Sequence, residues 1–360
     1  MRTLADQIIE AAANRKLDPF TRAMTDLAAK QIKASQRFVI NSDIHDEVRD
    51  LLISKPSTLL EACAWARPPF EQTWIEWPTS PDHPDPINKF RVKPDRIGAM
   101  ITAVPGSNNQ AWTFWTAWCY DTVHSAEQGR GLYGDEVAER MLAMERVGLG
   151  ISATEMAFDF RSYKGQNPHH AIEKSWIVPI PQSTEQLAAK RDDRYNSIKW
   201  ALQNAAEQEA INNIVSMLRW RVRQDPISME QMEFSIAMGN AATVSMLDDV
   251  RDEIGPLVGM LIMMNARNAI EHEKYDPPPK LVKARIKHGN KPPPVDYTVV
   301  RIKMSRVQAN RGGTAAEREA ARRHEVRGHF KVRRTGVFWW TPHKRGHGTE
   351  VSHDHYEVTP

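Results

Sequence analysis

Residues 67–77 are RPPFEQTWIEW, and at this stretch the chain changes from a helical pattern to a strand pattern. The two prolines stop helical structure because neither can donate a backbone hydrogen bond. The residues from Phe70 to Trp77 that follow them are rich in β-formers. We therefore expect a sheet region at residues 69–183, preceded by a helical region at residues 1–68.

The first helices are placed by their caps and their apolar spacing. Asp18 followed by Pro19 marks a helix start, because Asp accepts hydrogen bonds from free amides and Pro fits the first turn. Leu27, Ile32 and Phe38 extend this helix with an apolar stripe. Two Ser-capped helices follow before the prolines.

Several strands are expected in the sheet region. Residues 97–104 and 111–120 are rich in β-formers, and Gly106 to Asn109 supply a turn that makes them an antiparallel hairpin. Residues 151–160 and 172–180 have the composition to complete the sheet.

Helical spacing returns at residues 184–275. A long helix is expected at 195–223, and a second at 229–250. Pro256 breaks this pattern and begins an apolar helix that ends near Ala269. The predicted fold is α+β: a helical N-terminal region, a central antiparallel sheet and a helical bundle, with a small basic hairpin at the C-terminus.

The charge of the chain is strongly asymmetric. Residues 277–347 hold 18 Lys and Arg against 4 Asp and Glu, a net charge of +14, whereas residues 1–276 carry −8. A region with so much positive charge favours a polyanionic partner, most often nucleic acid. We divide the chain into an acidic body (1–275), a basic proline-spaced arm (276–321) and a His/Arg-rich hairpin with its tail (322–360).

The C-terminal hairpin is expected at residues 322–347. Gly336 can adopt the positive φ of a short turn at Arg333–Gly336, and Tyr297–Met304 is expected to pack against the hairpin as a third strand. The residues expected to bind nucleic acid are Arg301, Lys303, Arg327, Lys331, Arg333, Arg334, Trp340, Lys344 and Arg345.

Six of the 13 histidines lie between His324 and His355, and Arg-Gly-His occurs at both 327–329 and 345–347. One alternative is therefore a nuclease, possible with or without metal, in which His329 and His343 act as acid and base. Imidazoles also suit zinc. The metal-ligand candidates are His324, His329, His343 and His347.

Composition limits the remaining classes. Cys63 and Cys119 cannot build a disulfide framework, so we expect buried thiols and a cytoplasmic protein. No signal sequence is recognised, and the longest apolar run, Ile254–Met264, is shorter than the about 20 residues of a bilayer span. No membrane association is expected.

A glycine-rich loop lies at residues 128–134, QGRGLYG. Gln128 and Gly131 resemble the acyl-CoA loop of the GNAT superfamily of N-acetyltransferases, in which Tyr133 replaces the usual small residue. The resemblance covers about 50 residues and implies cofactor binding at Gln128, Gly129 and Gly131. The same glycines match a dinucleotide fingerprint, but no βαβ series surrounds them.

The C-terminal segment resembles a set of uncharacterised bacterial and phage proteins that end in His-x-Val-Arg-Gly-His, an aromatic strand and His-x-Arg-Gly. The matching residues are His324, Val326, Arg327, Gly328, His329, Trp340, His343, Arg345 and Gly346. The resemblance implies an origin in a mobile element, with the host-cell cytoplasm as the location of a phage-encoded protein, and assigns no catalytic role.

The leading hypothesis is a phage or mobile-element protein that binds nucleic acid through residues 280–347 without catalysis. The alternatives are the His-based nuclease, the acetyltransferase, and a structural or assembly protein whose cationic arm docks an acidic partner. The sequence leaves the oligomeric state open.

Overall fold

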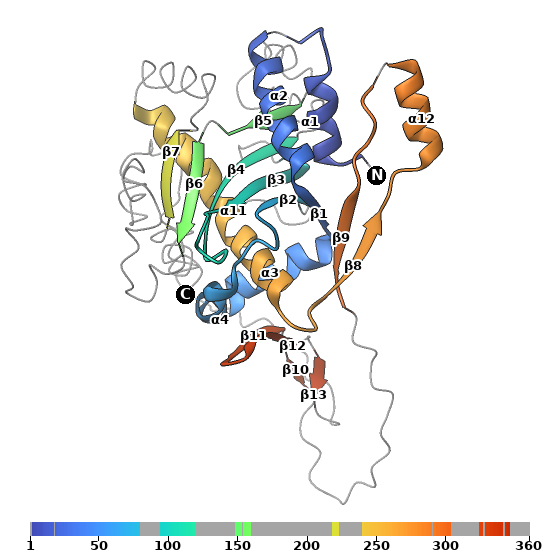
Figure 1. Cartoon of the computed structure of the whole chain (residues 1–360). Helices are drawn as coiled ribbons and strands as arrows, with labels where there is room; N and C mark the ends of the chain where they lie inside the picture. The colour runs from blue at the N-terminus through green and yellow to red at the C-terminus, as the bar shows by residue number, and fades with distance from the viewer. Residues whose placement is uncertain are drawn as a thin grey trace, which may run out of the picture.

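The computed structural model describes residues 2–17, 19–79, 94–119, 148–152, 154–159, 218–222, 240–289, 291–303, 324–326, 328–340 and 343–345. Its helices are α1 (Leu4–Ala12), α2 (Pro19–Ala34), α3 (Ser42–Ser54), α4 (Pro56–Ala62), the 3-10 turn η1 (Cys63–Trp65), α11 (Asn240–Asn265) and α12 (Pro279–His288) (Figure 1). Its strands are β1 (Gln36–Ile40), β2 (Gln72–Pro78), β3 (Arg96–Ala103), β4 (Ala111–Cys119), β5 (Leu149–Ile151), β6 (Thr154–Asp159), β7 (Leu218–Val222), β8 (Ile270–Tyr275), β9 (Tyr297–Ile302), β10 (His324–Val326), β11 (His329–Arg333), β12 (Gly336–Trp340) and β13 (His343–Arg345).

Strands β1 to β9 form one sheet in the spatial order β7-β6-β4-β3-β2-β1-β9-β8, with β5 paired to β4. The α+β class is confirmed, and so is the β3–β4 hairpin. The sheet is mixed rather than wholly antiparallel, because β1 runs parallel to both β2 and β9. Parallel neighbours need a crossover connection, and α3 and α4 supply it between β1 and β2.

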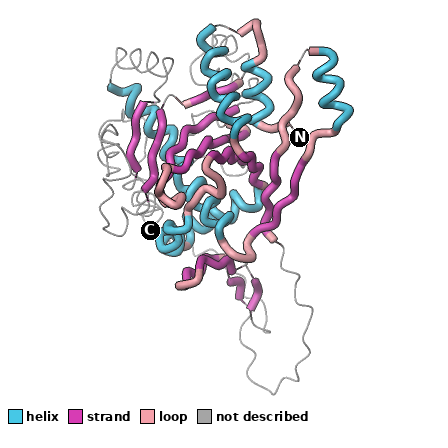
Figure 2. The backbone as a smooth tube through the Cα atoms, viewed as in Figure 1, coloured by secondary structure: helices cyan, strands magenta, loops and turns pink. Residues whose placement is uncertain are grey.

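Helices cover both faces of the sheet, and side chains alternate between the two layers. Trp112 and Phe114 of β4 pack with α3, α4 and α11, whereas Trp115 and Cys119 pack with α1 and α2. The helices and strands of this arrangement are coloured by type in Figure 2. The centre of the sheet is therefore apolar on both sides, which explains the Trp-rich composition of these strands.

Four predicted helical segments are corrected. Phe38 lies in β1 because Ser35 ends α2 by donating its hydroxyl to the carbonyl of Ile32, and Gln36–Ile40 then pairs on both edges. Leu218–Val222 is strand β7, whose alternating Leu, Arg, Trp, Arg and Val pair with β6. Ile270–Tyr275 is strand β8, because β9 offers it an edge.

The fourth correction concerns Pro256, which lies inside α11 instead of starting a new helix. A helical proline costs about 3 kcal/mol. The residues after it are almost all buried in the main core, and each large apolar side chain contributes about 1.5–3 kcal/mol.

Within the described residues, no helix combines the length and the apolar character that a bilayer span requires. The expected strand at 172–180 and most of the expected helix at 195–223 lie outside the described residues.

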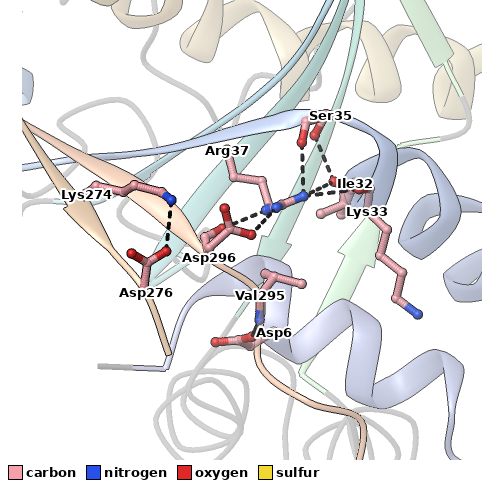
Figure 3. Close-up of polar contacts among 9 residues, drawn as sticks. All are labelled: Asp6, Ile32, Lys33, Ser35, Arg37, Lys274, Asp276, Val295 and Asp296. Carbon is pink, nitrogen blue, oxygen red and sulfur yellow. Dashed lines mark hydrogen bonds and ion pairs between the residues drawn. The ribbon is translucent and has the colours of Figure 1, made fainter. Parts of the chain in front are cut away.

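The part of the basic arm just before β9 is attached to the body, as Figure 3 shows. The amide of Val295 donates to Asp6 Oδ1 of α1 at 3.2 Å. Arg37 of β1 binds the carboxylate of Asp296 at 2.6 Å, while its Nη1 donates to three carbonyls at the end of α2. These contacts fix the point at which the chain enters β9.

Candidate nucleic-acid interface

The predicted C-terminal hairpin is present. β11 and β12 pair antiparallel from His329↔Trp340 to Arg333↔Gly336, which leaves a two-residue turn. Gly336 has φ +145°, a value that side chains rarely allow. β10 and β13 form a second ladder that ends at Val326↔His343. Two residues on each strand lie between the two ladders, so both ladders have the same register.

The hairpin packs on the helices below the sheet, not on Tyr297–Met304 as expected. Phe330, Val337 and Trp339 join the main core cluster with α4 and α11 (Figure 1). The amide of Arg267, just after α11, donates to the carbonyl of Val337 at 3.0 Å. β9 cannot serve as a third strand because β1 and β8 already occupy both of its edges.

The outer face of this hairpin carries two rows of side chains, which we call the ribbon face: His329, Lys331 and Arg333 on β11, and Phe338 and Trp340 on β12. Opposite residues of an antiparallel pair share a face, so the cations lie beside the rings. The two-row arrangement makes the ribbon face both positively charged and aromatic.

The cations of the ribbon face lean over its rings. Lys331 Nζ lies 4.6 Å from the centroid of the Trp340 ring, and the His329 ring lies 5.5 Å from it. The guanidinium carbons of Arg333 and Arg267 lie 5.4 Å and 5.7 Å from the centroid of Phe338. Cation–π contacts of this kind hold long side chains in place at an exposed surface. Sequence reasoning missed Arg267, whose position is set by the end of α11.

The other predicted binding residues are spread more widely. Arg334 is exposed in the turn of the hairpin. Arg301 of β9 pairs with Glu273 of β8 at 3.4 Å, and Lys303 is exposed just after β9. Lys344 and Arg345 belong to β13, and Arg327 lies outside the described residues.

The two histidines predicted as catalytic occupy different positions in the two ladders. His343 is paired with Val326, and His329 is paired with Trp340. His324 is paired with Arg345, and His347 is outside the described residues. In the part of the chain that the structure describes, no group of three His, Cys, Asp or Glu could hold a metal ion.

The cofactor-binding candidates Gln128, Gly129 and Gly131 also lie outside the described residues. Both cysteines are buried free thiols. Burial raises the pKa of Cys63 to about 12, and its Sγ donates to the carbonyl of Leu59, as expected of a packing residue.

Glu47 of α3 lies beneath the hairpin. A Cβ added to Gly328 would lie 2.5 Å from Glu47 Oε1 and 2.5 Å from Cζ2 of Trp339, so both side chains approach the backbone closely at this glycine. Burial, and then the charge of Asp50, raise the pKa of Glu47 to about 6. Sequence reasoning missed this carboxylate because only the packing of α3 against the hairpin reveals it.

A second basic surface lies on α12, between the two proline runs. None of its residues is buried, and Ile286 is 65% exposed. Lys280, Lys283 and Lys287 have the spacing of one helical face, which we call the α12 ridge. The helix was not predicted, although Pro279 at its start and Gly289, with φ +63° at its end, are its local signals.

Ion pairs hold α12 against the body. Arg285 donates to Glu10 Oε1 of α1 at 2.8 Å and to the carbonyl of Pro292 at 2.9 Å. Lys291 approaches Glu10 Oε2 at 3.5 Å. The α12 ridge is therefore presented on an attached helix at the far end of β8 and β9 from the hairpin, as Figure 1 shows.

Comparison with protein-family models, with curated proteins and with solved structures finds no match to this chain. The function must be inferred from the ribbon face and the charge around it.

Proposed function

We propose that this protein binds nucleic acid through the ribbon face, with the α12 ridge as a second electrostatic contact and without catalysis of its own. The observation that carries the proposal is the pairing of a cationic row with an aromatic row on a hairpin that is anchored in the core. Lysines and arginines neutralise phosphates, and exposed rings stack on bases. The charge of +14 over residues 277–347 supports the same partner.

The test is a salt titration of binding to a nucleic acid of mixed sequence, with the full chain and with Lys331→Ala/Arg333→Ala/Arg334→Ala. Each lost phosphate contact should reduce the slope of log K against log salt by about 0.7–0.9, so the triple variant should lose about 2. The matched control is Lys30→Ala, a surface cation on α2 that pairs with Asp26. No binding by the full chain, or equal slopes for all three proteins, would reject the proposal. In the first case, binding to an acidic protein becomes the better hypothesis.

Substitution is a sharper test than truncation. Removing the chain after residue 276 would delete β9 from the sheet, together with Phe330, Val337 and Trp339 from the core. If such a fragment did not bind, unfolding and loss of the interface would explain the result equally well.

We also infer an origin in a mobile element and a cytoplasmic location. The resemblance of the C-terminal motif to that of phage and bacterial proteins supports the first inference, and the two buried free thiols support the second.

A further inference from the structure

We infer that the ribbon face takes an unpaired strand of nucleic acid, with its phosphates along β11 and its bases along β12. This inference rests on the proposed function and deepens it by naming the form of the ligand. It is carried by the placement of the cations on one strand of the hairpin and the rings on the other.

The two rows match the two sides of a single strand. β11 contributes His329, Lys331 and Arg333. β12 contributes Trp340 opposite His329 and Phe338 opposite Lys331. Neighbouring strands of a ribbon are about 4.8 Å apart, so the rows run side by side along its whole length. A single strand also carries its phosphates on one side and its bases on the other, and can lie along the ribbon with both sides in contact.

The spacing of the two rings does not fit two adjacent bases that are stacked on each other. Phe338 and Trp340 are two residues apart on one strand, which separates them by about 7 Å. Successive nucleotides of a duplex strand rise by only about 3.4 Å. Two adjacent bases can therefore contact one ring each only if they are unstacked from each other. A duplex does not permit this without opening.

Exposure of Trp340 supports the same ligand. Its side chain is 42% exposed, while its neighbour Trp339 is buried on the inner face. Duplex DNA offers phosphates to a surface and keeps the faces of its bases covered, so it would use the cations of the ribbon face and leave this indole in water. An unpaired base would cover the indole and gain stacking energy.

The experiment measures fluorescence anisotropy of a labelled single strand of about 16 nucleotides, the upper range for one small single-strand site, against a blunt duplex of the same sequence. The full-length protein is compared with Trp340→Ala, Trp340→Phe and Phe70→Ala. Phe70 is the matched control, because it is 48% exposed but its ring stacks on Phe38, outside the ribbon face. Thermal unfolding of each variant shows whether the hairpin remains folded.

Stacking is worth about 1–3 kcal/mol per base, so Trp340→Ala should weaken single-strand binding about 5- to 150-fold. Trp340→Phe should restore part of that loss, while duplex binding and the Phe70→Ala variant should be nearly unchanged. Equal binding of both probes with no effect of Trp340→Ala would overturn this inference and leave the proposed function standing. Absence of binding to either probe would reject the proposed function itself.

Discussion

The backbone amide of Arg267 donates a 3.0 Å hydrogen bond to the carbonyl of Val337, which joins the end of α11 to the second strand of the hairpin. Isolated two-stranded ribbons are only marginally stable in water. Here the bond and the burial of Phe330, Val337 and Trp339 attach the ribbon to the main core. The outer ribbon face is consequently held in a defined position, and its stability is coupled to that of the whole protein.

Gly328→Ala should loosen this attachment. The new Cβ would lie 2.5 Å from Glu47 Oε1 and from Trp339 Cζ2, so the hairpin or these side chains must move. Overpacking of this kind costs about 1–3 kcal/mol in the free energy of unfolding. Urea unfolding measures the loss, with the exposed turn substitution Thr335→Ala as the control. A Gly328→Ala protein as stable as the control would show that the close approach is easily relieved.

Glu76→Gln should be among the most destabilising single substitutions. Glu76 is fully buried, its Oε1 accepts from the amide of Leu4 at 3.1 Å and Nε of Arg96 at 3.2 Å, and its Oε2 accepts from Ala5 and Trp74. An amide removes the charge that compensates buried Arg96 and places an N–H group against other donors. Breaking a buried pair costs about 3–5 kcal/mol.

Urea unfolding of Glu76→Gln is compared with that of the control Glu271→Gln. Glu271 is an exposed carboxylate on β8. The control should change the free energy of unfolding by no more than about 0.5 kcal/mol. If both substitutions had similar small effects, the network around Glu76 would not be what anchors α1 to the sheet.

Stability should depend on pH through Glu47. Its pKa rises from 4.5 to about 6 on folding, by burial and by the charge of Asp50. The folded protein holds this proton more tightly than the unfolded chain does, so the contribution is favourable at low pH and is lost as pH rises from 4.5 to 6. Because the side chain is only half-buried, solvent screening limits the penalty at neutral pH to about 1 kcal/mol.

Glu47→Gln should therefore raise the free energy of unfolding at pH 7 by up to about 1 kcal/mol and leave it nearly unchanged at pH 4. Thermal unfolding of wild type and variant across this range measures the difference. A difference that is constant with pH would mean that the carboxylate is not titrating beneath the hairpin.

Lys280→Ala/Lys283→Ala/Lys287→Ala should leave stability unchanged within about 0.5 kcal/mol, because no residue of α12 is buried and Arg285 still holds the helix to Glu10. If the α12 ridge contacts phosphates, the slope of log K against log salt should fall by about 2. An unaltered slope in this variant, beside a reduced slope in Lys331→Ala/Arg333→Ala/Arg334→Ala, would confine binding to the hairpin.

Local signals were sufficient for some elements. The β3–β4 hairpin and the β11–β12 hairpin were predicted because a turn sequence lies between two β-rich runs, and Gly336 adopts the positive φ that its turn requires. Other elements conflicted with local preference. Pro256 was expected to start a helix but lies inside α11. Phe38 continues the apolar spacing of the preceding helix in the sequence but lies in strand β1.

By itself, the sequence determined the charge asymmetry, the α+β class and the tight turns, since each depends on neighbours in the chain. Only the tertiary structure decided that β1 runs between β2 and β9, that the arm enters the sheet through Asp6 and Arg37, and that Glu47 lies under the hairpin. These features join residues that are distant in the chain, and burial of shared apolar surface selects among many pairings that local propensity leaves equal.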